Sequence, residues 1–193
     1  MEWTIPVQSL DIKKVCISTI SKGNKPMATL SYSDGDISFP YLSVLLPILP
    51  VKSYDAETGR LSVSLNGNTG LISKLTALQT HIIQTTYENF TSWFPSERKR
   101  SYEEIVNYFQ PLISHGCIHL YCPVSAPGIF NDIHVYSKGG WTKGVISSDT
   151  FTVGKPIRIA VRFQGISLHQ HLILKKLTGK SRVQHRILAI YTD

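Results

Sequence analysis

The chain has 193 residues, of which 42% are hydrophobic and 17% are charged, and it carries a net charge of +7 with a pI near 9.3. This length predicts a single domain, and the apolar content argues against disorder, because burial of that surface can offset the entropy lost on ordering. An odd number of cysteines argues against a disulfide framework, and we see neither a signal-peptide pattern nor an apolar run long enough to span a bilayer. We therefore expect an intracellular protein with no membrane partner.

The first 67 residues alternate short apolar segments with turn residues, which is typical of strands joined by tight connections. We expect strands over 11–21, 27–32 and 60–65. The segment 37–49 is also apolar, but Pro40 and Pro47 interrupt it. Because proline cannot donate a hydrogen bond to a sheet, this segment is expected to be an edge strand or extended chain.

A two-helix insertion is predicted over 68–113. Apolar residues recur here about every 3.6 positions, which indicates an amphipathic helix that begins at Asn68 or Thr69 and ends before Pro95. Ser101 and Glu104 then have the spacing of a capping box, so a second, shorter helix should follow.

Strands resume over 117–124 and 132–137, and the chain ends in a long hairpin over 153–193. The first strand of this hairpin alternates clearly. Its apolar face is Ile157, Ile159, Val161 and Phe163, and its polar face is Arg158, Arg162 and Gln164. Such alternation predicts a half-buried strand, and the number and spacing of all the strands favour a small barrel or a sandwich.

The positive charge is concentrated towards the C-terminus. From Lys138 onward, only Asp149 and Asp193 oppose the cations. A one-sided basic region points to a polyanion, with nucleic acid ahead of an anionic membrane surface, and the alternative is a basic protein whose arginines are simply solvated. The candidate nucleic-acid-binding residues on outward faces are His134, Tyr136, Lys138, Trp141, Lys143, Arg158, Arg162, Lys175, Lys176, Lys180, Arg182 and Arg186.

The loop between the two predicted helices is a separate candidate. It places Phe94 close to three consecutive cations, and it could clamp a strand of nucleic acid. The candidates are Phe94, Arg98, Lys99 and Arg100. The alternative is a solvated loop in which Phe94 packs against the helices.

A metal site and an active site are both weakly supported. His115, Cys117, His119 and Cys122 are possible zinc ligands, but their spacing is not that of a zinc knuckle or ribbon. On a strand, Cys122 would also point away from the other three. No phosphate-binding glycine loop or nucleophile motif is present, and carboxylates are sparse in the predicted strands. We therefore expect no metal, no cofactor and no enzymatic activity.

The stretch 102–193 resembles single-stranded DNA-binding proteins of large DNA viruses and, more distantly, those of short-tailed phages. A phenylalanine–x–proline step, Phe109 to Pro111, leads into the strand over 116–123. The further matching segments are 133–136, 138–140, 157–166 with its glycine–isoleucine step, and 182–187 with its basic–x–glutamine pattern.

This resemblance implies a mainly β (α+β) fold, an OB-like antiparallel barrel with additional strands and a two-helix insertion. The single domain 1–193 would then divide into N-terminal strands (1–67), the helical insertion (68–113) and C-terminal strands (114–193). Two departures matter. Ser167 stands where such families often carry tryptophan, and the acidic C-terminal tail of the phage proteins has no counterpart, so partner contacts would lie elsewhere.

The expected function is binding and protection of single-stranded DNA during viral replication, recombination or repair, at replication sites in the host cell. Phosphates would contact the cations and bases would stack on the rings. Viral replication proteins are expected partners, and self-association into a homo-oligomer is left as an alternative. The alternative is a viral structural or assembly protein of β-sandwich type with a nucleic-acid-facing basic surface, and a nuclease is a third hypothesis.

Overall fold

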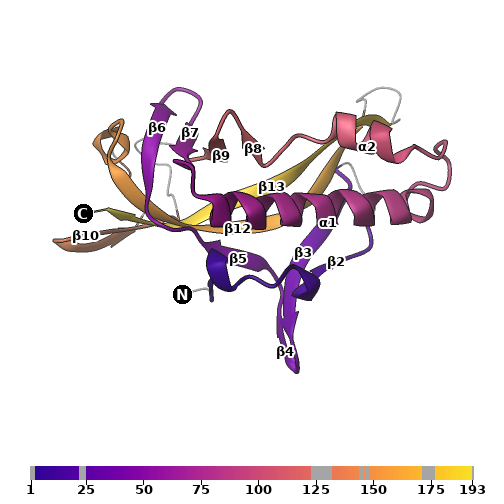
Figure 1. The fold of residues 1–193 in the computed structure, drawn as a ribbon, viewed down its shortest axis with the longest axis horizontal. Helices are drawn as coiled ribbons and strands as arrows, with labels where there is room; N and C mark the ends of the chain where they lie inside the picture. The colour runs from indigo at the N-terminus through magenta and orange to yellow at the C-terminus, as the bar shows by residue number, and fades with distance from the viewer. Residues whose placement is uncertain are drawn as a thin grey trace.

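The computed structural model describes residues 3–21, 25–122, 132–143, 146, 148–170 and 177–192. These residues form a mainly β protein with one 13-stranded sheet and two α-helices (Figure 1). The mainly β class with a helical insertion is thereby confirmed. No helix among the described residues is long and apolar enough to cross a membrane.

The fold is built on a long antiparallel hairpin of β12 (Pro156–Gln170) and β13 (Leu177–Thr192). The predicted alternation in β12 is confirmed. Ile157, Ile159, Val161 and Phe163 are at most 1% exposed. The register between β12 and β13 shifts between Ala160 and Val161 and at two later positions, so the hairpin contains bulges. Each bulge changes which residues of the two strands lie opposite each other.

The second edge of β12 is shared by three strands in succession. These are β6 (Leu49–Asp55), β5 (Leu42–Leu45) and β3 (Met27–Asp34). β3 also pairs with β2 (Val15–Ile17) and β4 (Ile37–Phe39), and β5 pairs in parallel with β1 (Ile5–Pro6). The expectation of a sheet edge over 37–49 is therefore wrong for β5. Its two prolines fall outside the strand and leave both of its edges free to pair.

The sheet continues from β6 to β7 (Arg60–Ser64), β9 (Cys117–Tyr121) and β8 (Ile113–Ser114). At its other end, β13 pairs in parallel with β10 (His134–Ser137), which forms a hairpin with β11 (Gly140–Lys143). The strand order runs from β11 to β8 without joining them, so the described strands form an open sheet and a closed OB-like barrel is not confirmed. β9 nevertheless lies near β13: the Tyr121 backbone N–H on β9 donates to Nε2 of His185 on β13 at 2.8 Å.

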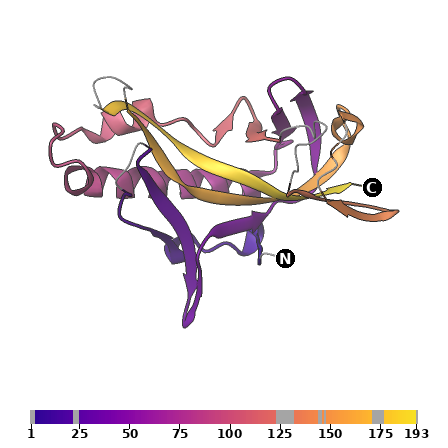
Figure 2. The same ribbon diagram turned by 180° about the vertical axis from the view of Figure 1, so that it is seen from behind.

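Helix α1 (Thr69–Trp93) crosses one face of the β12–β13 hairpin, and α2 (Tyr102–Tyr108) lies beside its far end (Figures 1 and 2). Both predicted caps are confirmed. The Asn68 side chain accepts from the Leu71 N–H, and Ser101 and Glu104 form a complete capping box. The apolar face of α1 joins the inward residues of β12 in one hydrophobic core. This packing covers one face of the hairpin and leaves the opposite face for other contacts.

The predicted strand over 11–21 is wrong at its start. Asp11 caps a 3-10 helix, η2 (Ile12–Lys14), by accepting a hydrogen bond from the Lys13 N–H at 3.0 Å. Aspartate favours such local caps over extended pairing, so the strand begins only at Val15. Two further 3-10 helices, η1 (Val7–Ser9) and η3 (Ser148–Phe151), lie in connections.

Candidate nucleic-acid interface

A row of rings crosses three neighbouring strands, β13, β10 and β11, on the face opposite α1, and Arg158 on β12 continues the row. Arg158 on β12 lies opposite Tyr191 on β13, which lies opposite Tyr136 on β10, which lies opposite Trp141 on β11. We call Tyr191, Tyr136 and Trp141 the aromatic row. The two tyrosine rings stack with centroids 4.7 Å apart and planes 11° apart, and Trp141 is 62% exposed. Such a row presents aromatic surface to which an unpaired base can add.

A row of small residues runs beside the aromatic row. Ala160 lies opposite Ala189, and Ala189 lies opposite His134 on β10. Both alanines are buried, so the surface is lower here than on either side. The His134 ring lies 5.7 Å from that of Trp141, and its Nδ1 is buried without a hydrogen-bond partner among the described residues.

The third row contains a pair of like charges. Arg162 and Arg186 lie directly opposite each other on β12 and β13. The Arg162 guanidinium sits 4.3 Å above the ring of Tyr41. Burial, and then the charge of Arg186, lowers the pKa of Arg162. Like charges in register destabilise a sheet, so this pair is a feature that packing alone does not favour.

One carboxylate partly compensates these cations. Asp132 accepts a hydrogen bond from Arg186 at 2.9 Å, and Nζ of Lys143 lies 3.4 Å from its second oxygen. Hydrogen bonds from both cations lower the pKa of Asp132, so it stays ionised. Its side chain is 64% exposed, which keeps the pairing accessible to a competing anion.

A hollow of about 320 Å³ lies between the ring side and the arginine side, and we call it the outer groove. Its position over the alanines follows from the strand register. Rings can stack with a base on one side while guanidiniums hold a phosphate on the other. Its principal lining residues are His134, Tyr136, Tyr191, Arg162, Arg186, Ala160 and Ala189.

Arg158 lies on the other side of Tyr191. Its Nε donates to the Leu46 carbonyl at 3.2 Å, which fixes the guanidinium beside a second hollow of about 250 Å³. Tyr191 lines both hollows and therefore forms the ridge between them.

The structure brings together seven of the predicted binding residues around the outer groove and the aromatic row. They are His134, Tyr136, Trp141, Lys143, Arg158, Arg162 and Arg186. Lys138 lies in the exposed turn between β10 and β11, next to this surface. Lys180 and Arg182 lie near the far end of the hairpin, where they line a hollow beside α2. Lys175 and Lys176 fall outside the described residues.

The loop before α2 does not join this surface. Phe94 is 9% exposed and packs on Phe90 with ring centroids 5.3 Å apart. This placement matches the alternative of a packed ring, so we leave Phe94 out of the interface. Arg98 pairs with Glu104, and its hydrogen bonds lower the pKa of Glu104 to about 2.

The other two loop cations are arranged differently. The Arg100 guanidinium lies 5.5 Å from the centre of the Phe90 ring and 5.7 Å from that of Tyr108. Lys99 is exposed. Arg98 and Arg100 therefore make contacts that stabilise the junction of α1 and α2.

Sequence reasoning missed three residues of this candidate interface. Tyr191 lies at the end of β13, beyond the bulge that changes the phase of the hairpin. Tyr41 comes from the N-terminal third of the chain, and no local pattern predicts that it reaches Arg162. Asp132 could have been noticed as a carboxylate placed just before a strand rich in rings.

The possible zinc ligands make other contacts. Nδ1 of His119 bonds to the Ser62 hydroxyl at 2.8 Å, and Nε2 bonds to the Ser114 hydroxyl at 2.9 Å. Cys122 is fully buried, and burial raises its pKa to about 12. Within the part of the chain that the structure describes, no group of three or more such residues is placed to hold a metal ion.

Comparison of the chain with protein-family models found no match, and a search of curated proteins found none either. The function must therefore be inferred from the geometry of the interface.

Proposed function

We propose that the protein binds single-stranded DNA without catalysing a reaction, and that the outer groove and the aromatic row are its binding surface. The backbone phosphates lie along Arg162, Arg186 and Lys143, and successive bases stack on Tyr191, Tyr136 and Trp141. This mode protects exposed single strands during replication, recombination or repair. The sheet curves so that β9 lies beside β13 without pairing with it. This curvature is consistent with an OB-like barrel that is left open between these two strands.

The observation that carries the proposal is the in-register arginine pair next to stacked rings. Arg162 and Arg186 are like charges directly opposite each other on β12 and β13, and such a pair is unfavourable in a sheet. A phosphate placed between the two guanidiniums would remove the repulsion and accept charge-assisted hydrogen bonds. Binding of a polyanion thus relieves an unfavourable contact that the fold retains.

The groove favours single strands over duplex. Tyr136 and Tyr191 line the outer groove, and Tyr191 forms the ridge between this groove and the hollow beside Arg158. Only an unpaired base can swing out of its strand and lie flat against these rings, because bases in a duplex are already stacked and paired. We therefore expect weak dependence on base sequence and strong dependence on salt.

The test is a salt series of binding to fluorescent dT, rU and duplex oligomers. Arg162→Gln with Arg186→Gln should weaken dT binding and make the slope of log K against log salt shallower by about 1.4, since each phosphate contact to a single strand contributes about 0.7. The matched control is Lys13→Gln with Lys52→Gln, which removes the same charge from exposed positions elsewhere. Undetectable dT binding at low salt, or equal loss in both double variants, would overturn the proposal.

The same series tests the assembly alternative. A structural protein with a merely basic surface should bind duplex as tightly as dT, because phosphate contacts alone do not distinguish them. Degradation of the oligomer when a divalent metal is added would instead favour a nuclease.

A further inference from the structure

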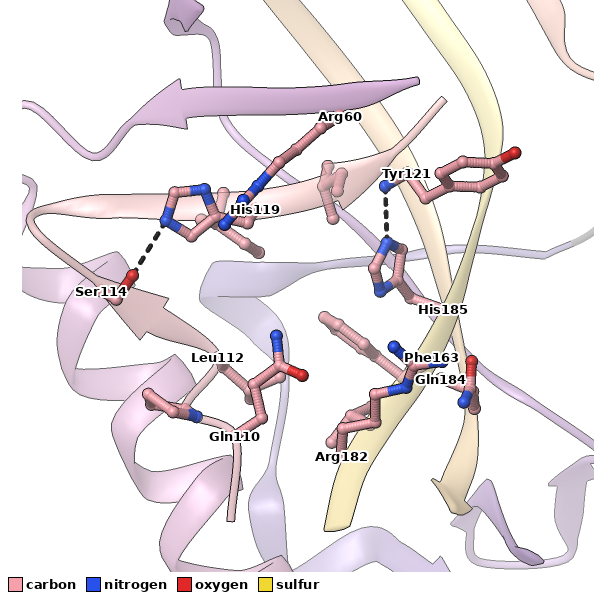
Figure 3. Close-up of a pocket in the computed structure, with 14 residues that line it drawn as sticks. Arg60, Gln110, Leu112, Ser114, His119, Tyr121, Phe163, Arg182, Gln184 and His185 are labelled. Carbon is pink, nitrogen blue, oxygen red and sulfur yellow. Dashed lines mark hydrogen bonds between the residues drawn. The ribbon is translucent and has the colours of Figure 1, made fainter. Parts of the chain in front are cut away.

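Another hollow, separate from those described above, lies where β9 and β13 face each other without forming strand pairs among the described residues. The Tyr121 N–H bond to His185 Nε2 is the hydrogen bond that joins the two strands across this gap among the described residues. Further along β13, the Gln110 N–H donates to the Ser181 carbonyl at 2.8 Å. Between these two links is a cavity of about 420 Å³, which we call the seam pocket (Figure 3). Its volume lies within the range of small-molecule sites in proteins.

The seam pocket has an apolar base and a polar rim. Phe163, Ile118 and Leu120 lie at its base and are at most 3% exposed. Gln110 and Arg182 lie on opposite sides of the hollow, and Arg60 comes from β7 on the side of His119 (Figure 3). One ligand could therefore place an apolar body against the base and hydrogen-bonding groups at the rim.

The rim is positively charged, and among the described residues its two arginines have no carboxylate partner. Among the residues that the structure describes, no carboxylate lines the seam pocket. Neither the Arg60 nor the Arg182 guanidinium makes an ion pair or hydrogen bond with any other described residue, whereas Arg98 and Arg186 each have a carboxylate partner. The two imidazoles add little, because both nitrogens of His119 bond to serine hydroxyls and Nε2 of His185 already accepts from Tyr121. A guanidinium without a carboxylate partner at the rim of a cavity is suited to a phosphate group, to which it can donate paired N–H bonds.

We propose that the seam pocket binds a nucleoside monophosphate unit, with its phosphate at the cationic rim to which Arg60 and Arg182 belong and its base against the apolar floor beside the Gln110 amide. A bare phosphate would leave the apolar floor empty, and a nucleoside would leave both guanidiniums without an anion. The unit is either a free mononucleotide or the phosphorylated end of a strand. The site is distinct from the outer groove, which is lined by Arg162 and Arg186.

Calorimetric titration with dTMP, thymidine and inorganic phosphate tests the proposal. The wild-type chain should bind dTMP at least about tenfold more tightly than either fragment. Arg60→Gln with Arg182→Gln should weaken dTMP binding by about tenfold or more, and Gln110→Trp should block it by filling the hollow. Lys13→Gln with Lys52→Gln is the charge-matched control. All five substituted positions carry exposed side chains, and thermal unfolding verifies that each variant is folded.

Two oligomer arms distinguish the sources of the ligand. If the strand end is the ligand, dT with a 5′ or 3′ phosphate should bind more tightly than dT with hydroxyl ends, and the gain should vanish in the Arg60 and Arg182 variant. If the free nucleotide is the ligand, dTMP binds but the end phosphate gives no gain. Either result supports the site. Absence of dTMP binding at millimolar concentration, or binding that the Arg60 and Arg182 variant retains, overturns it.

Failure of the seam pocket and failure of the outer groove give different results. The Arg162 and Arg186 variant should lose dT binding and keep dTMP binding. The Arg60 and Arg182 variant should lose dTMP binding and keep binding of dT oligomers with hydroxyl ends. If dT does not bind while dTMP does, the proposed function falls and the seam pocket stands.

Discussion

Asp132 is a residue whose substitution is expected to strengthen DNA binding instead of weakening it. Among the described residues it is the acidic residue that lines the outer groove, and it pairs with Arg186 and Lys143 where we expect phosphates to bind. Asp132→Asn should therefore raise the affinity for dT oligomers at low salt, by about threefold to tenfold. Asp36→Asn, in an exposed turn, is the matched control and should have a smaller effect. Equal gains in both variants would assign the effect to net charge alone.

Tyr191 is the ring on which the stacking model depends most. It is half-buried, stacks on Tyr136 and forms the ridge between two hollows. Tyr191→Ala should weaken dT binding by about 5- to 150-fold, which corresponds to the loss of one stacked base at ~1–3 kcal/mol. Tyr191→Phe keeps the ring and should bind within about twofold of wild type. If the phenylalanine variant binds as weakly as the alanine variant, the hydroxyl and not the ring is what DNA contacts.

At the scale of elements, Gly165 sets how closely β3 can approach β12. A Cβ atom added there would lie 2.4 Å from the Ala28 carbonyl oxygen, a backbone atom that cannot move without shifting β3. Gly165→Ala should therefore lower the free energy of unfolding by about 1–3 kcal/mol. Gly139→Ala, where nothing lies within 4 Å, should change it little. Chemical denaturation of both variants measures the difference.

The contact between β9 and β13 makes stability depend on pH. Burial, with a smaller effect of the Arg182 charge, lowers the pKa of His185 below its ordinary value of 6.5. The unfolded chain then binds the proton more readily than the folded chain. The stability that neutral His185 contributes is complete above about pH 6.5 and is lost as the pH falls towards the lower, folded-state pKa.

The measurement is urea denaturation at pH 7.5 and 5.5. The wild-type chain should lose more stability over this interval than His185→Gln, whose amide oxygen can still accept from the Tyr121 N–H but cannot be protonated. Carboxylates titrate lower and contribute little in this window. Equal pH dependence in the two proteins would show that another histidine is responsible.

Local elements could be predicted from the sequence, and their partners could not. The helix at Asn68, the capping box at Ser101 and the alternation that begins at Ile157 depend on neighbours within a few residues, and all three are confirmed. The pairing of β12 with three N-terminal strands depends on contacts more than 100 residues apart, for which no periodicity exists.

In the candidate site, too, local features could be predicted from the sequence and long-range contacts could not. Arg158 and Arg162 could be predicted to share a face because alternation alone decides it. Tyr41 and Tyr191 could not be predicted, because their positions depend on tertiary pairing and on a bulge that shifts the register by one residue. The burial of Phe94 likewise depends on how α1 packs, which a loop sequence does not reveal.

At the scale of the whole molecule, the proposed surface gathers side chains from strands distributed along the chain. Its charge comes mainly from the last quarter, and Tyr41 comes from the first third. The loop before α2 does not join this surface, so a cation there should contribute less to binding than one on β12 or β13. We expect Lys99→Gln to leave dT affinity within about twofold of wild type in the same titrations.

The central place of β12 in the sheet has a consequence for biosynthesis. β3, β5 and β6 are all complete by Asp55, whereas the strand that joins them begins only at Pro156. At roughly 5–20 residues per second, the ribosome takes several seconds to make the intervening hundred or so residues. During that interval the N-terminal strands expose unpaired edges of the kind that cause aggregation. The nascent N-terminal third should therefore be a substrate for ribosome-associated chaperones until the last hairpin emerges.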